Sequence, residues 1–172
     1  MSELLEALPD DIERAACELL ELACAHELSI ATAESCTGGL LASLLTDVEG
    51  ASHAFERGFV TYSDDAKREL LGVPSETLDS HGAVSRETAV AMAEGGLERS
   101  RADLVLSITG FAGPAAPGDE PGRVHFACAA RGQNTVERAE HFGDIGRGPV
   151  RLAALRVAME MLQAAAEKSR KP

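Results

Sequence analysis

A turn with two hydroxyls, a thiol and two glycines carries the clearest chemistry in this sequence. Ser35, Cys36 and Thr37 stand directly before Gly38 and Gly39. Glycines let the backbone turn sharply and let a ligand approach it closely. A serine or cysteine at such a turn can attack a carbonyl carbon once a base removes its proton. The turn therefore predicts a nucleophilic site, and the competing interpretation is an ordinary helix start capped by a hydroxyl.

The segments on either side of this turn favour a ligand site. Residues 28–31 form an apolar run typical of a buried strand, and residues 40–45 form a run typical of a helix. Open α/β sheets bind ligands at the carboxyl ends of their strands, and the N–H groups of a helix start can hold an anion such as phosphate. The residues of this turn that we expect to contact a ligand are Glu34, Cys36, Thr37, Gly38 and Gly39.

Three kinds of side chain are candidates for the base that a serine needs. The five histidines lie in no recognisable triad motif, and the sequence has no GxSxG elbow. Lys67 lies on the first turns of a predicted helix, shortly after Tyr62 at a strand end. A lysine becomes a base when burial lowers its pKa, whereas a solvated lysine near Asp64 would stay charged. Glu34, next to Ser35, is the third candidate.

The cysteines do not indicate a metal site. No CxxC spacing occurs, and His125 and Cys128 are placed on a predicted strand so that they point to opposite faces. Cys17 and Cys24 follow a helical spacing that predicts free thiols on one shared buried face. We therefore expect no bound metal.

Two further segments are candidates for ligand contacts. Thr109 and Gly110 end a predicted strand and lead into a glycine-rich loop, so they can offer a hydroxyl or N–H groups to the same ligand. Arg147 and Arg151 lie at the start of the last predicted helix, where the helix dipole disfavours cations. A phosphate ligand would offset that cost, and two solvated arginines are the alternative.

The elements that must position these residues alternate along the chain, which predicts an α/β fold. We expect a three-layer α/β/α sandwich with a mixed, mostly parallel sheet of about five strands, in which a hairpin near residues 131–134 makes one strand antiparallel. The chain reads as a single domain over 1–172 with a structured core of about 10–165. Expected helices cover 10–24, 39–46, 64–71, 87–98 and 146–168; expected strands cover 28–31, 55–62, 103–108, 123–129 and 135–141.

Composition excludes several classes of partner. The formal net charge of -12 repels nucleic acid and anionic membrane surfaces. Aromatic residues are only 3%, so platforms for base stacking are scarce. The N-terminus lacks the features of a signal peptide and no apolar run is long enough to span a membrane, so we expect a cytoplasmic protein.

A series of ordered motifs resembles the CinA C-terminal domain family, the nicotinamide-nucleotide amidohydrolases. The resemblance covers about residues 10 to 165. The motifs that carry it are the turn 33–40, the segment 58–63 with Lys67, Leu71-Gly72-Val73, the segment 81–85, Met92-Ala93, the segment 109–114, and Gly143-Asp144 with Arg147 and Arg151.

This resemblance implies hydrolysis of the carboxamide of nicotinamide mononucleotide to nicotinic acid mononucleotide and ammonia, without a cofactor or metal. It implies Ser35 as the nucleophile, Lys67 as its base and Tyr62 as a residue that relays or holds the proton. Arg147 would hold the substrate phosphate. The resemblance also implies the stand-alone form of the family and a homo-oligomer.

Two features keep alternatives open. Cys36 is a rival nucleophile, because a thiolate at a helix N-terminus has a lowered pKa. The segment 115–122 is shorter than the run that the family usually has and lacks its lysine, and residues 143–147 depart from the usual Gly-Asp-Arg run. A non-catalytic module that senses nucleotides is therefore the alternative function.

Overall fold

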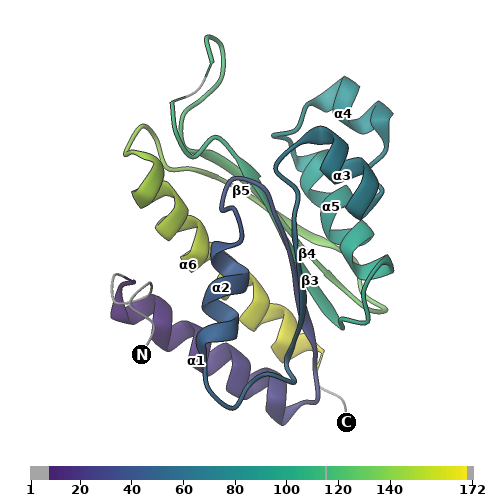
Figure 1. The fold of residues 1–172 in the computed structure, drawn as a ribbon, viewed down its shortest axis with the longest axis vertical. Helices are drawn as coiled ribbons and strands as arrows, with labels where there is room; N and C mark the ends of the chain where they lie inside the picture. Colours follow the sequence, from purple (N-terminus) through teal and green to yellow (C-terminus); the bar gives the residue numbers. More distant parts are fainter. Residues whose placement is uncertain (1–7, 115, 170–172) are drawn as a thin grey trace.

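A five-stranded sheet forms the middle of the molecule, and its strands lie in the order β2-β1-β3-β4-β5. The computed structural model describes residues 8–114 and 116–169. Figure 1 shows the strands and helices in chain order. The strands are β1 (Ile30–Glu34), β2 (Phe55–Val60), β3 (Leu104–Gly110), β4 (Arg123–Ala130) and β5 (Val136–His141).

The sheet is mixed, as predicted. Strand β1 pairs in parallel with both β2 and β3, whereas β4 pairs antiparallel with both β3 and β5. Strand β4 therefore runs against the other four. Because β1, β2 and β3 are parallel neighbours, their carboxyl ends meet at one edge of the sheet, where the predicted site residues follow β1 and β2.

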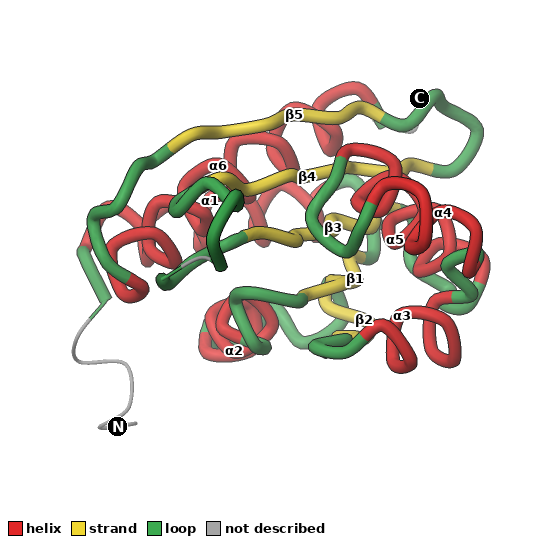
Figure 2. The backbone as a smooth tube through the Cα atoms, turned by 90° about the horizontal axis from the view of Figure 1, so that it is seen from above, coloured by secondary structure: helices red, strands yellow, loops and turns green. Residues whose placement is uncertain are grey.

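Helices cover both faces of this sheet, which confirms the three-layer arrangement (Figure 2). One face carries α1 (Asp10–Ala25), α2 (Leu40–Asp47) and α6 (Arg147–Lys168). The other face carries α3 (Asp64–Leu71), α4 (Ser75–His81) and α5 (Arg86–Glu98). None of the helices in the described part of the chain is long and apolar enough to cross a membrane.

Strand β1 is buried on both sides, and its side chains alternate between the two layers of helices. Ile30 packs into the core under α1, α2 and α6, whereas Ala31 and Ala33 pack into the core under α3 and α5. This alternation continues past the strand end. It places Glu34 and Ser35, which are adjacent in sequence, on opposite sides of the sheet.

The structure corrects three expectations about local structure. No helix is predicted from the sequence over residues 75–81, but α4 forms there. Only Leu78 of its side chains is buried, so the sequence shows no apolar period in this segment. Cys17 is exposed and Cys24 is half-buried, so the shared buried face expected for these two thiols is wrong. Both cysteines lie beside the buried stripe of α1 rather than on it.

Strand β2 is the third correction. The period of two in a strand predicts from the sequence that Phe55, Arg57, Phe59 and Thr61 share one face. This prediction is wrong for Phe55. The β1–β2 register shifts between Ile30 and Ala31, and this irregularity changes the side of the sheet to which Phe55 points. Phe55 packs on the α2 side, and Phe59 packs on the α3 and α5 side.

Close packing of α5 against the end of α3 anchors the segment that carries Lys67. A Cβ atom on Gly95 would lie 1.8 Å from the carbonyl oxygen of Leu71, the last residue of α3. Backbone rather than a flexible side chain fills that space, so no rotamer change can make room.

Gly95→Ala is therefore expected to lower the free energy of unfolding by about 1–3 kcal/mol, the usual cost of overpacking, despite the better helix propensity of alanine. Urea denaturation of the purified protein measures this. Gly148→Ala in α6 is the matched control, since a Cβ there meets nothing within 4 Å. Equal stability of the two variants would contradict the packing argument.

Candidate active site

Ser35 and Lys67 meet at the carboxyl end of β1. The Nζ atom of Lys67 lies 3.2 Å from the Oγ atom of Ser35 and 3.0 Å from the carbonyl oxygen of Thr61. Ser35 comes from the turn after β1, and Lys67 reaches it from α3 on the same side of the sheet. The two residues are 32 positions apart in sequence, so the fold alone brings them together.

The buried position of Lys67 follows from the way α3 begins. The Ser63 hydroxyl caps the helix by accepting a hydrogen bond from the N–H of Ala66, and Asp64 and Asp65 lie in its first turn. This start directs Lys67 inward, where only 1% of the residue is exposed. Burial lowers the pKa of Lys67, because the charged ammonium loses its hydration, and the negative charge of Asp64 opposes this shift in part. A lysine of this kind can accept the proton of a serine.

Glu34 holds the start of α2 and does not reach the ligand side. Its fully buried carboxylate accepts hydrogen bonds from the backbone N–H groups of Gly39, Leu41 and Ala42 at 2.8–3.1 Å. It also accepts one from the hydroxyl of Thr32 at 3.2 Å. All of these contacts lie on the α2 face. The interpretations of Glu34 as a base and as a substrate contact are therefore corrected: this carboxylate caps a helix.

The turn after β1 leaves two backbone donors unused. The N–H of Gly38 donates to the carbonyl of Ser35 at 3.1 Å, and the N–H of Gly39 goes to Glu34. For the N–H groups of Cys36 and Thr37, no acceptor is recorded within residues 8–114 and 116–169. Gly38 and Gly39 adopt positive φ angles of 62° and 91°, which only glycine takes without strain. Two donors directly after a nucleophile form a candidate oxyanion hole.

The thiol of Cys36 does not have the character expected of a nucleophile. The residue is 7% exposed, and burial raises the pKa of its thiol to about 12. The expected lowering by the helix start is wrong, because loss of hydration outweighs the positive charges of Arg151 and Lys67 nearby. The geometry therefore favours Ser35 over Cys36.

A pocket of about 280 Å³ opens above Ser35 and Lys67. The predicted residues Cys36, Tyr62, Thr109, Gly110 and Arg147 line it as well. Tyr62 forms part of its rim with 67% of the residue exposed, and no hydrogen bond joins its hydroxyl to Ser35 or Lys67 among the recorded contacts. Thr37, Gly38 and Gly39 are not among the lining residues, so of the two unused donors only the N–H of Cys36 belongs to a residue that lines the pocket.

A segment for which the sequence indicated no ligand contact completes the wall. Ala83 and Val84 line the pocket from the turn before α5. The buried hydroxyl of Thr109 donates to the carbonyl of Ala83 at 2.6 Å, which holds this turn in place. The signal that would have found Ala83 is the run 81–85 in the motif series, whose middle residues Gly82, Ala83 and Val84 have no reactive side chain.

Arg147 lies over the glycine-rich loop on the far side of the pocket. A Cβ atom on Gly113 would come within 2.7 Å of the Nη2 atom of Arg147, so the guanidinium lies directly against this glycine. The start of α6 has no side-chain cap, and no carboxylate partner of Arg147 is recorded in the described residues. An unpaired guanidinium at an uncapped helix start suits a phosphate group.

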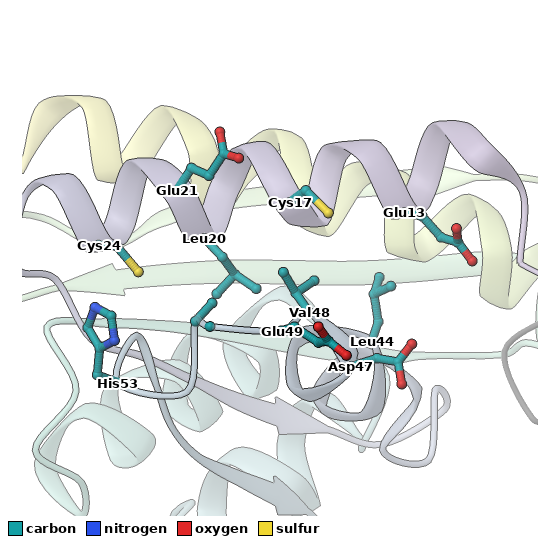
Figure 3. Close-up of a pocket in the computed structure, with 12 residues that line it drawn as sticks. Glu13, Cys17, Leu20, Glu21, Cys24, Leu44, Asp47, Val48, Glu49 and His53 are labelled. Carbon is teal, nitrogen blue, oxygen red and sulfur yellow. The ribbon is translucent and has the colours of Figure 1, made fainter. Parts of the chain in front are cut away.

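A larger hollow lies elsewhere and lacks a reactive pair. Its volume is about 730 Å³, and it lies between α1 and the region of α2 and the following turn. Figure 3 shows Cys17, Cys24 and His53 around it together with four carboxylates. The described residues hold no group of three or more metal-ligating side chains, here or at His125. We therefore place the candidate active site in the smaller pocket, where the serine and the buried lysine meet.

Comparison with protein families now adds to this geometry. The model of the CinA C-terminal domain matches residues 12–166. This chain belongs to that family. A nicotinamide-nucleotide amidohydrolase, PncC, of Escherichia coli K12 is 48% identical over 141 residues, which cover 80% of this chain and 84% of that protein.

Longer relatives and solved structures agree with this membership. A CinA-like protein of Akkermansia muciniphila is 54% identical over 112 residues, or 64% of this chain, but the chain spans only 27% of that relative's length. It spans 29% of a relative from Symbiobacterium thermophilum. The crystal structure of the competence/damage inducible protein CihA from Agrobacterium tumefaciens superposes with a TM-score of 0.90 at 47% identity, covering 94% of this chain and 99% of that chain.

The pH dependence of Ser35 reactivity tests the lysine. We expect labelling of Ser35 by a fluorophosphonate probe to accelerate as pH rises through a pKa lower than the roughly 10.4 of a free lysine, because only neutral Lys67 can accept the proton. Lys67→Arg is expected to label as slowly as Lys67→Ala, since arginine keeps its proton at working pH. Intact-mass measurement follows the adduct.

Lys168→Arg makes the same substitution at the end of α6, outside the pocket, and should label at the wild-type rate. If Lys67→Arg also labels at that rate, Lys67 supplies only charge and another group is the base.

Proposed function

We propose that this chain hydrolyses the carboxamide of nicotinamide mononucleotide to nicotinic acid mononucleotide and ammonia. The observation that carries the proposal is the buried contact between Lys67 Nζ and Ser35 Oγ at 3.2 Å, at the floor of a pocket with unused N–H donors beside it. Support also comes from the 48% identity to a protein named as a nicotinamide-nucleotide amidohydrolase over most of both chains.

The first half of the reaction forms an acyl-enzyme. Neutral Lys67 accepts the proton of the Ser35 hydroxyl while Oγ attacks the carboxamide carbon. The N–H group of Cys36, which lines the pocket, donates to the oxygen that becomes negative, and such a donor is typically worth about 3 kcal/mol in the transition state. Lys67 then gives its proton to the amide nitrogen, the C–N bond breaks, and ammonia leaves.

The second half releases the acid. Water loses a proton to Lys67, its oxygen attacks the ester carbon, and Ser35 recovers its proton as the C–O bond to the enzyme breaks. The pyridinium ring of the substrate is positively charged and withdraws electrons from the carbonyl, so the chemistry does not require a metal as electrophile. Since Lys67 contacts Ser35 directly, the proton needs no relay through Tyr62. We assign the exposed ring of Tyr62 to contact with the pyridinium, whose charge an aromatic face attracts.

The phosphate of the substrate meets the start of α6. The whole protein is negatively charged, so its general field does not attract an anionic nucleotide. Arg147 and the first N–H groups of its helix therefore provide local attraction at the pocket wall.

Self-association of this chain stays a prediction. Strand β2 lies at the edge of the sheet and Val60 is exposed on it, so this edge can pair with a second copy.

Ammonia release from nicotinamide mononucleotide by the purified protein, without added metal, tests the function directly. Ser35→Ala is expected to lose ammonia release while substrate binding remains measurable by calorimetry, because only the nucleophile is missing. Cys36→Ala is the matched control at the neighbouring position and should retain activity. Loss in Cys36→Ala with activity retained in Ser35→Ala would exchange the two assignments. Binding without turnover by the wild-type protein would favour the nucleotide-sensing alternative.

Arg147→Ala is expected to lower kcat/KM for the nucleotide substrate by about ten- to a hundredfold, because one charge-assisted hydrogen bond is typically worth about 1.5–3 kcal/mol. The riboside that lacks the phosphate serves as the control substrate, and kcat/KM for it should change little. Steady-state kinetics on both compounds measure the difference. Equal losses would show that Arg147 supports the fold or the chemistry instead of the phosphate.

A further inference from the structure

Arg151 makes a contact that the mechanism above does not use. It lies one turn after Arg147 on α6, and its Nη2 donates to the carbonyl oxygen of Thr37 in the turn after β1. The contact joins residues 114 positions apart. A Cβ atom on Gly38 would lie 3.8 Å from that same nitrogen, so the guanidinium lies against the turn itself.

Arg151 also differs from the six arginines of the described residues that pair with a carboxylate. Arg57, Arg138 and Arg156, for example, each pair with a carboxylate. Arg151 has no recorded carboxylate partner among the described residues, and its buried Nε has no hydrogen-bond partner there. Placing a cation in a half-buried position without a counter-charge is costly. We therefore expect the positive charge of Arg151 to act on a neighbouring group of the site.

A short chain of hydrogen bonds leads from Arg151 to the candidate oxyanion hole. The guanidinium polarises the Thr37 carbonyl, and the N–H of the same peptide unit belongs to Gly38. That N–H donates to the carbonyl of Ser35 at 3.1 Å, and the N–H of the Ser35 peptide unit belongs to Cys36. Hydrogen-bonded amides strengthen one another, by about 10–30% per bond in condensed phase. The end of the chain is the N–H directly after the nucleophile, which is where an oxyanion donor is needed.

We propose that Arg151 is a positioning residue that holds and polarises the turn after Ser35, so that the N–H of Cys36 becomes a stronger donor to the oxyanion. The proposal rests on the proposed amidohydrolase function. The two arginines at the start of α6 then have different roles. Arg147 contacts the substrate phosphate, and Arg151 acts through the turn after Ser35 on the transition state.

Steady-state kinetics of three variants and one control variant test these different roles of Arg147 and Arg151. Arg151→Gln is expected to lower kcat for ammonia release by about 10–100-fold, somewhat less than the loss of an oxyanion donor outright, with KM unchanged. Arg151→Lys keeps the charge and should recover part of kcat. Arg147→Ala should raise KM instead. Arg156→Gln is the control and should behave as wild type. Arg156 lies further along α6, and this substitution breaks its exposed ion pair with Asp11 of α1.

A second measurement does not depend on the natural substrate. A fluorophosphonate probe forms a bond from Ser35 Oγ to phosphorus as fluoride leaves, and its transition state also places a negative oxygen in the oxyanion hole. Arg151→Gln is expected to react about tenfold or more slowly while its thermal unfolding midpoint stays at the wild-type value. If wild type reacts with the probe but releases no ammonia, the proposed function fails while the probe still tests Arg151.

Three outcomes would overturn the proposal. They are an unchanged kcat and probe rate in Arg151→Gln, a rise in KM matching that of Arg147→Ala, and a loss of rate that follows a lowered unfolding midpoint with no recovery in Arg151→Lys.

Discussion

The buried carboxylate of Glu34 is the constraint on which the site depends. It satisfies three N–H groups at the start of α2, which would otherwise be buried without partners close to the sheet. Because strand side chains alternate, fixing Glu34 on the α2 side directs Ser35 to the α3 side. The same cap fixes the position of Gly39 and thereby the turn between Ser35 and α2. One interaction thus places the nucleophile and leaves the N–H groups of Cys36 and Thr37 available.

The second requirement is a lysine without its hydration. Lys67 is buried between its own helix and the end of β1, and its Nζ has just two recorded partners in the described residues, the Ser35 hydroxyl and the Thr61 carbonyl. Neither partner is charged, so burial dominates and the pKa of Lys67 falls. The close approach of α5 at Gly95 holds the end of α3, which keeps this arrangement rigid.

Electrostatics in this protein are local rather than global. The chain carries a net charge of -12, yet Arg147 and Arg151 lie beside the candidate site without recorded carboxylate partners in the described residues. An anionic substrate is therefore selected at the pocket and not by long-range attraction. The start of α6 gathers both cations at one place, and the parallel strand ends bring the turn after β1 to the same edge of the sheet.

Local patterns in the sequence determined the order of elements, the mixed sheet and the motif that contains Ser35 and Lys67, because apolar periodicity, caps and glycines act between near neighbours in the chain. They also indicated Arg147, whose place at a helix start is unusual for a cation. The helix 75–81 was missed, since one buried side chain gives no period. Only the tertiary structure decided which side of the sheet each residue of the turn faces. It turned Glu34 into a cap, buried Cys36 so that its thiol pKa rises, and brought Arg151 onto Thr37. These outcomes depend on which backbone groups remain unpaired and which charges lose their water once distant segments pack together, and no stretch of sequence contains that information by itself.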